Sequence, residues 1–227
     1  MHSAVLVANT DESDFAQAHP KDGAKFAALL QGLRPGWRVS AFSVKDGEFP
    51  AEADRFDGWI ITGSPASVHD SDAWVGRLLG LIRQIVARGE PLFGACFGHQ
   101  AIAVALGGVV GENPGGWVFG AVETVMEGVQ MRLYAAHREQ VLEAPVGAVV
   151  LGGNADCVVG SFAMGPAVLT TQYHPEMTHD FMTALVAEYA GKLPAEVAAR
   201  AVESLAVAAD RDVIAARMVR FFEEAAE

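Results

Sequence analysis

Two short segments of the chain carry the residue types of a cysteine nucleophile and its base. Residues 94–98 (Gly-Ala-Cys-Phe-Gly) place a thiol between two glycines, and residues 174–176 (His-Pro-Glu) place an imidazole two residues before a carboxylate. A cysteine attacks a carbonyl carbon when a histidine takes its proton and an acidic residue orients that histidine. We therefore interpret Cys96 as a nucleophile, His174 as its general base and Glu176 as the residue that orients the imidazole.

The surroundings of Cys96 predict a sharp strand-to-helix turn. A short apolar run precedes Cys96, and an Ala- and Leu-rich stretch that ends in glycine follows it. The glycines leave room in so tight a turn, and the positive end of the helix favours the thiolate. The N–H of Phe97 is then placed to face a developing oxyanion. The alternative, a buried structural thiol, is less favoured because glycine stands on both sides.

The histidine segment is a weaker signal when it is taken alone. An isolated His-Pro-Glu tripeptide is equally typical of a solvated turn. Residues 167–174 predict a strand, in which residues two apart point the same way, so that His174 and Glu176 both reach the catalytic side. The combination with the cysteine turn is what indicates catalysis.

Both motifs resemble those of the class I (triad) glutamine amidotransferases. G-x-C-x-G-x-Q at 94–100 and Q-x-H-P-E at 172–176 stand in that family's order, and residues 56–68 resemble its strand and glycine-rich oxyanion loop. The resemblance covers roughly residues 4–190. It implies a flavodoxin-like α/β/α sandwich, with a mostly parallel central sheet and a small antiparallel addition. It also implies that Gly63 supplies a second oxyanion N–H beside that of Phe97.

The family's chemistry is cysteine-dependent hydrolysis of a γ-glutamyl amide, through a γ-glutamyl thioester that would form on Cys96. Ammonia or an amine leaves, and water then releases glutamate. The resemblance further implies substrate contacts for Gln100, Trp117 and His137. Each has a plainer interpretation: an exposed helix residue for Gln100, packing for Trp117, and a structural role for His137, because Ala136 stands where relatives often carry serine.

Length and pattern predict one α/β domain over residues 1–227. The chain is 51% hydrophobic and 19% charged, an ordinary globular balance. Strands and helices alternate up to the cysteine turn, which predicts parallel strands with helices on both faces and a site at their carboxyl ends. The expected elements include a polar loop at 9–22, a helix at 73–87, and short strands at 118–126 and 157–162. The core spans 4–190. A helical extension at 195–227 has a surplus apolar face, which predicts capping of the domain or a homodimer.

Composition indicates which partners and which cellular compartment to expect. A net charge of −12 argues against binding to nucleic acid or to an anionic membrane. Two cysteines make no disulfide framework, so we expect Cys157 to be structural and the protein to be cytoplasmic. The seven histidines are too scattered to predict a metal site, and we expect no cofactor. No apolar run has the length of a membrane span, and the N-terminus lacks the features of a signal peptide.

Three functions stay open at this point. The chain is either an amidotransferase subunit that passes ammonia to a synthase, or a γ-glutamyl peptidase that works without a partner. The third function, a non-catalytic binding module, is disfavoured by the intact set of Cys96, His174 and Glu176. A cysteine-dependent α/β-hydrolase is a more distant alternative, because its histidine follows a separate acidic residue instead of preceding it by two positions.

Overall fold

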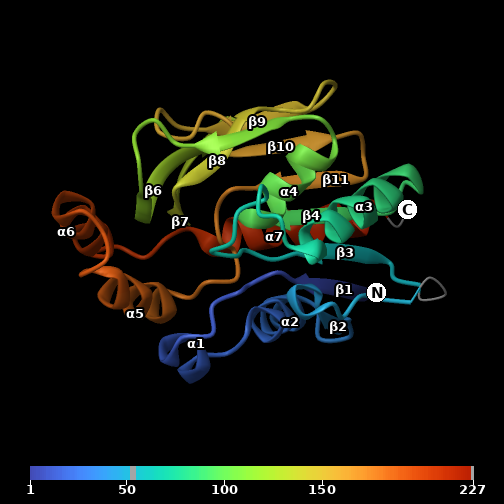
Figure 1. The fold of residues 1–227 in the computed structure, drawn as a ribbon, viewed down its shortest axis with the longest axis horizontal. Coiled ribbons are helices and arrows are strands. Elements are labelled where there is room, and N and C mark those ends of the chain that lie inside the picture. The colour runs from blue at the N-terminus through green and yellow to red at the C-terminus, as the bar shows by residue number, and fades with distance from the viewer. Residues whose placement is uncertain (52–54, 226–227) are drawn as a thin grey trace.

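A nine-stranded sheet forms the centre of the computed structural model, which describes residues 1–51 and 55–225 (Figure 1). Five neighbouring strands are parallel, in the order β2-β1-β3-β4-β11. They are β1 (His2–Val7), β2 (Arg38–Ser43), β3 (Gly58–Ile61), β4 (Leu92–Ala95) and β11 (Val168–Thr171). This arrangement confirms the expected flavodoxin-like sandwich.

The antiparallel addition continues the same sheet. From β11 the order runs β10-β9-β6-β7, and each of these pairs is antiparallel. These strands are β6 (Val118–Met126), β7 (Val129–His137), β9 (Val149–Gly153) and β10 (Ser161–Met164). A separate pair, β5 (Val109–Glu112) with β8 (Glu139–Glu143), lies beside it.

Helices cover both faces of the parallel strands because successive strand residues point to opposite sides. Leu6 and Ile61 pack with α3 (Ala73–Ala87) and α4 (Phe97–Ala105). Val5, Ile60 and Phe93 pack on the other face with α2 (Asp22–Leu33) and α7 (Arg211–Glu224). The remaining helices are α1 (Asp14–Ala18), α5 (His179–Tyr189), α6 (Ala195–Ser204) and the 3₁₀ turn η1 (Val44–Asp46).

The C-terminal extension caps the domain. Phe222 of α7 is fully buried and shares a core cluster with Phe26 of α2. Its ring lies so close to Gly58 that a Cβ there would come 2.6 Å from the Phe222 ring. The apolar face of α7 thus packs within the chain, against α2 and the sheet.

The structure corrects several predicted boundaries. The strand predicted up to His174 ends at Thr171, and the strand predicted from Cys157 begins only at Ser161. Cys157 lies instead in a turn, where its N–H donates to Asn154 Oδ1. The predicted loop at 9–22 contains α1, a short helix without buried residues that carries no apolar periodicity to reveal it.

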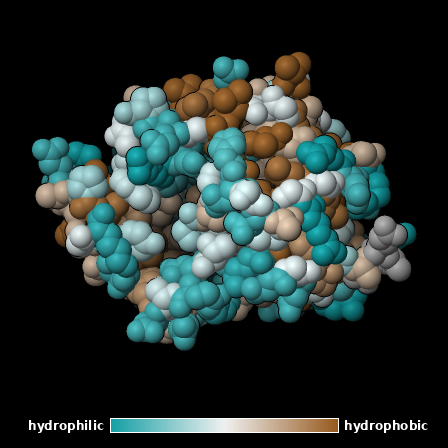
Figure 2. Space-filling model, in the orientation of Figure 1, coloured by the Kyte–Doolittle hydropathy of each residue, from teal (hydrophilic) through white to brown (hydrophobic). Residues whose placement is uncertain are grey.

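Hydrophilic and hydrophobic residues are unevenly spread over the face shown in Figure 2. Hydrophobic residues gather at the top of this view, over the antiparallel strands. Val149 and Val150 of β9, one of those strands, are exposed. None of the helices in 1–51 and 55–225 has the length and apolar character that crossing a bilayer requires.

Candidate active site

Cys96 occupies the predicted sharp turn between β4 and α4. It is the N-cap of α4, with φ 50° and ψ −108°, a backbone conformation that residues other than glycine rarely adopt. Its N–H donates to Thr171 O at 2.9 Å, which ties the turn to β11. A Cβ at Gly94 would lie 2.6 Å from the Gly98 backbone, and one at Gly98 would overlap Ile61 O. Glycine is therefore required on both sides.

His174 and Glu176 form a buried pair. His174 Nδ1 and Glu176 Oε1 are 2.7 Å apart, and the two residues are 5% and 4% exposed. They follow β11 in an irregular segment instead of lying within a strand. That segment is anchored twice, because His174 N–H donates to Tyr134 O and Arg211 Nε donates to Pro175 O. Tertiary contacts therefore bring the pair together where a strand was predicted to do so.

The charges around His174 favour its imidazolium. Burial is the largest single influence and lowers the pKa of His174, but the negative charges of Glu176 and Cys96, together with hydrogen bonding to these groups, outweigh it. The net result is a His174 pKa well above the ordinary value for histidine. Its Nε2 is buried and has no hydrogen-bond partner among the described residues. The arrangement suits a thiolate–imidazolium pair.

Gly63 and Phe97 supply two backbone amides beside the sulfur. Gly63 follows β3, and a Cβ built on it would lie 3.5 Å from Cys96 Cβ. Gly98 N–H donates to Thr62 O at 3.1 Å, which holds the Gly63 segment against the start of α4. Within residues 1–51 and 55–225, neither the Gly63 nor the Phe97 amide has an acceptor. Two free donors therefore stand next to Cys96.

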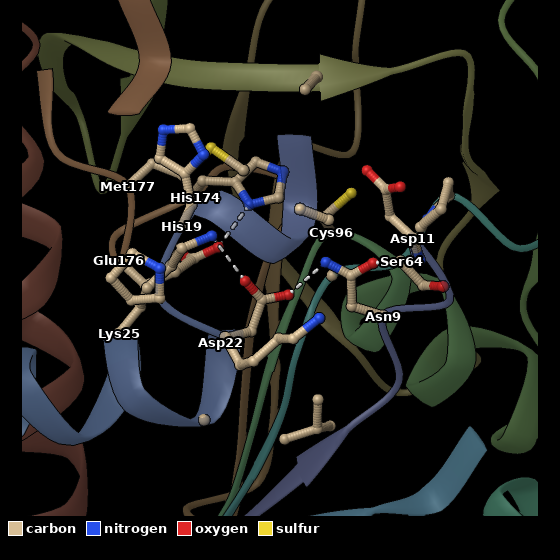
Figure 3. Close-up of a pocket in the computed structure, with 18 of the residues that line it drawn as sticks. Asn9, Asp11, His19, Asp22, Lys25, Ser64, Cys96, His174, Glu176 and Met177 are labelled. Atoms are coloured by element: carbon tan, nitrogen blue, oxygen red, sulfur yellow. Dashed lines mark hydrogen bonds and ion pairs between the residues drawn. The ribbon is translucent and has the colours of Figure 1, made fainter. Parts of the chain in front are cut away.

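A cavity of about 470 Å³ opens from these residues (Figure 3). Cys96, His174, Glu176 and Gly63 all line it. One wall is largely apolar and includes Trp117, Phe119, Met177, Leu185 and Tyr189. A second part of the lining, the polar wall, is largely polar and comes from residues 9–25 and 43–48.

The three predicted substrate contacts are placed differently. Trp117 lines the cavity. Gln100 and His137 are each 4% exposed and lie outside the lining of that cavity. They meet instead at one carbonyl, since Gln100 Nε2 donates to Glu139 O at 2.8 Å and His137 Nδ1 lies 3.1 Å from the same oxygen. The alternative of an exposed Gln100 is wrong, because β8 and Gln172 cover it.

Burial keeps two other histidines and the second cysteine neutral. It lowers the pKa of His137 to about 4, against an opposing hydrogen bond to the Glu139 backbone. It lowers the pKa of His99 to about 3, against a hydrogen bond to the Val159 backbone. Burial likewise raises the pKa of the Cys157 thiol to about 12. A protonated, inert Cys157 agrees with its predicted structural role.

The polar wall contains a group of residues that the sequence patterns did not predict. Asn9, Asp22 and Lys25 lie there in one hydrogen-bonded group, with Asn9 Nδ2 and Lys25 Nζ each donating to Asp22 at 2.8 Å. Figure 3 shows this group on the same cavity as Cys96 and Glu176. The only available signal was the placement of residue 9 directly after a strand, at the carboxyl edge of the sheet. In the part of the chain that the structure describes, no three His, Cys, Asp or Glu side chains are grouped to hold a metal ion.

A cysteine turn at the carboxyl edge of a flavodoxin-like sheet, with a buried His–Glu pair beside it, is the arrangement that the fold and the cavity define. The family model for class I glutamine amidotransferases matches residues 31–188, and the chain belongs to that family. Members of the family, including its γ-glutamyl peptidases and amidotransferases, are enzymes.

Named relatives agree with this assignment, and a solved structure agrees with the fold. The chain is 29% identical over 195 residues to γ-glutamyl peptidase 4 of Arabidopsis thaliana, which covers 78% of this chain and 77% of the relative. It is 31% identical over 140 residues to one chain of the glutamine-hydrolysing GMP synthase of Saccharolobus solfataricus, covering 56% of this chain and 71% of the relative. The crystal structure of a glutamine amidotransferase from Thermotoga maritima superimposes with a TM-score of 0.77, at 15% identity and with coverage of 100% and 98%.

Proposed function

We propose that this chain hydrolyses γ-glutamyl amides through a γ-glutamyl thioester on Cys96. The observation that carries the proposal is the meeting of Cys96 with the buried His174–Glu176 pair at one cavity. The Cys96 thiolate attacks the γ-carbonyl carbon, and the amides of Gly63 and Phe97 donate to the resulting oxyanion. The His174 imidazolium then gives its proton to the leaving nitrogen as the carbon–nitrogen bond breaks.

The second half of the reaction regenerates the thiolate. His174 takes a proton from water, whose oxygen attacks the thioester carbon and forms a second tetrahedral intermediate. Collapse of this intermediate breaks the carbon–sulfur bond and releases glutamate. Glu176 holds Nδ1 of His174 at 2.7 Å throughout and stabilises the imidazolium whenever His174 carries the second proton. A reducing compartment such as the cytoplasm keeps the thiolate available, and we propose that location.

We assign the predicted substrate contacts to two different roles. Trp117 lines the cavity and contacts substrate there. Gln100 and His137 act indirectly, without touching the substrate, because both fix the Glu139 carbonyl at the start of β8. The carboxylate of Glu139 in turn accepts a hydrogen bond from Ser67 Oγ at 2.8 Å, in the loop after Gly63. These two residues therefore keep the loop beside Cys96 in place.

The size of the cavity favours a γ-glutamyl peptidase that needs no partner. A leaving ammonia molecule needs about the space of one water, about 30 Å³. The cavity measures about 470 Å³ and extends along residues 9–25, so it has room for a leaving group of many atoms. The peptidase named among the relatives supports the same choice. The alternative, ammonia delivery to a separate synthase, is supported by the related GMP synthase chain.

Product release by the purified chain tests the proposal. Glutamate and the released amine or ammonia would be measured with glutamine and with a set of γ-glutamyl peptides, and Cys96→Ala would serve as the control. Fast peptide cleavage that disappears in the variant supports a self-sufficient peptidase. Slow glutaminase activity alone, which rises when a partner protein is added, supports ammonia delivery instead. Turnover that persists in Cys96→Ala contradicts the thioester on Cys96.

A further inference from the structure

Lys25 is held rigidly in the wall of the catalytic cavity. Its side chain is only 11% exposed, and Nζ donates to Asp22 Oδ1 at 2.8 Å. The ammonium also lies 3.5 Å from the centroid of the Phe181 ring, within the range of a cation–π contact. Asp22 is fixed in turn by Asn9 Nδ2 at 2.8 Å. Binding a ligand at Lys25 therefore immobilises little that is not already ordered.

This ammonium keeps donors that the described residues do not use. An ammonium has three N–H donors, and Asp22 is the one carboxylate within 4.0 Å of Lys25 Nζ in the described part of the chain. The other lysines of the polar wall differ. Lys45 is paired with both Glu12 and Asp46, at 2.7 and 2.9 Å, and the Lys21 side chain is 59% exposed. Lys25, whose side chain is mostly but not fully covered, is the cation with capacity left for an acceptor.

The backbone around Lys25 also favours an anion. The whole first turn of α2, residues 21–25, lines the cavity. The positive end of a helix attracts negative charge, and this helix has 12 residues. Lys25 and Glu176 line a second, adjoining cavity of about 480 Å³ as well, so that space continues past the ammonium.

Acidic residues on the rest of the polar wall limit where an anion can bind. Glu12 and Asp46 are both paired with the single ammonium of Lys45, while Asp11 and Glu48 also line the cavity. In Figure 3 Asp11 lies on the Cys96 side, whereas Lys25 and Asp22 lie on the Glu176 side. On the Cys96 side, the carboxylate of Asp11 repels a ligand carboxylate. The ammonium of Lys25 therefore offers the more favourable binding position for it. The wall thus orients an anionic group as well as binding it.

We propose that Lys25 determines leaving-group specificity by binding a carboxylate of the departing amine. The preferred substrates are then γ-glutamyl amides of amino acids and peptides, in preference to glutamine and to amides of neutral amines. This inference rests on the proposed hydrolysis at Cys96. It adds the residue that recognises the leaving group, Lys25, and the negative charge that the leaving group must carry.

Two ligands that differ in one group test the inference: γ-glutamylglycine, which carries a carboxylate, and γ-glutamylglycinamide, which carries a carboxamide. Their affinities would be measured by calorimetry with the Cys96→Ala chain, so that the readout does not depend on turnover. We expect the carboxylate to bind about 10- to 100-fold more tightly, as a hydrogen bond to a charged group implies. Adding Lys25→Met should remove this difference by weakening the carboxylate ligand alone. The ratio of kcat/KM values in the chain with Cys96 should change in the same way.

Matched variants separate specificity from folding. Lys25→Met leaves the buried Asp22 unpaired, so Asp22→Asn combined with Lys25→Met removes both charges together. Lys192→Met is the control, because Lys192 also pairs with a carboxylate, Glu188, and an aromatic ring, Tyr189, but lies outside the cavity lining. It should keep the preference for the carboxylate.

The outcomes distinguish the two proposals. A preference that survives in both Lys25 variants, or a Cys96→Ala chain that binds neither ligand, overturns the role of Lys25. A Lys25-dependent preference in binding, without cysteine-dependent turnover of any substrate, upholds Lys25 and contradicts the proposed hydrolysis.

Discussion

Gly63 lies directly against the imidazole of His174. A Cβ built on Gly63 would come 2.9 Å from His174 Cε1, closer than real Cβ contacts allow. The ring cannot move away freely, because Glu176 holds Nδ1 at 2.7 Å and Tyr134 O holds the backbone. The glycine after β3 therefore has two effects: it presents a free amide beside Cys96, and it leaves the space that the imidazole occupies.

Gly63→Ala should lower kcat by about 10- to 100-fold, because the added methyl group displaces His174 from the sulfur and such a shift costs about this much. The measurement is kcat on the best γ-glutamyl substrate, with thermal unfolding to show that the fold is kept. Gly80→Ala in α3 is the control, since a Cβ there meets nothing within 4 Å. It should retain activity and gain up to about 1 kcal/mol of stability from helix propensity. Equal activity in the two variants would show that the Gly63 contact does not position His174.

The backbone conformation at Cys96 predicts that two inactive variants of this residue differ in stability. A residue other than glycine at φ 50°, ψ −108° carries strain of about 1–3 kcal/mol. Cys96→Ala keeps that strain, whereas Cys96→Gly relieves it but loses about 0.5–1 kcal/mol through the greater freedom of the unfolded chain. We expect both variants to be inactive, and Cys96→Gly to be the more stable of the two by about 1 kcal/mol in urea titrations. A less stable Cys96→Gly would rule out strain at this turn.

Glu176→Gln should move the alkaline limb of the kcat/KM profile to lower pH. The negative charge of Glu176 helps to hold the His174 pKa above its ordinary value, so removing it lets the imidazolium lose its proton earlier. The rate should also fall less than in His174→Ala, because an amide still orients the ring while a missing base has no substitute. Rates over a range of pH values provide the measurement. An alkaline limb that stays in place would mean that Glu176 does not set the His174 pKa.

The His174–Glu176 pair should also make the stability of the folded protein depend on pH. The folded-state pKa of His174 lies above its unfolded value of about 6.5, so its charge contributes fully below about pH 6.5. That contribution is lost as pH rises through the folded-state pKa. The stability difference between the unsubstituted chain and Glu176→Gln should therefore be largest in mild acid and shrink at alkaline pH. Denaturant titrations at several pH values measure it, and a difference that grows with pH would contradict the charge assignment.

Local elements could be predicted from the sequence better than the contacts between distant ones. The helix at 73–87 and the strand at 118–126 have the predicted bounds, because their apolar residues repeat at helical or strand spacing. The turn at Cys96 was also recognisable, since its glycines are a local steric requirement. The segment at His174 was not, because a hydrogen bond to Tyr134, from a strand about 40 residues earlier, shapes it in place of a strand of its own. The position of Lys25 could not be predicted for the same reason: only the fold brings α2 to the edge where Cys96 lies.

The fully buried His99 should make the protein less stable in acid. Its pKa is lowered from 6.5 to about 3, so between these values the unfolded chain binds a proton that the folded chain excludes. Stability then falls as pH decreases through this window, by about 1.4 kcal/mol per pH unit for one proton. His99→Gln is destabilised at neutral pH, because the imidazole contacts Thr170 Oγ1 at 2.8 Å and Val159 O at 3.1 Å. Its acid slope should nevertheless be shallower by about 1.4 kcal/mol per pH unit near about pH 5, while the slopes of the two proteins coincide above about pH 7.5. Denaturant titrations at closely spaced pH values measure both slopes, and identical slopes near about pH 5 would mean that His99 already carries its proton in the folded protein.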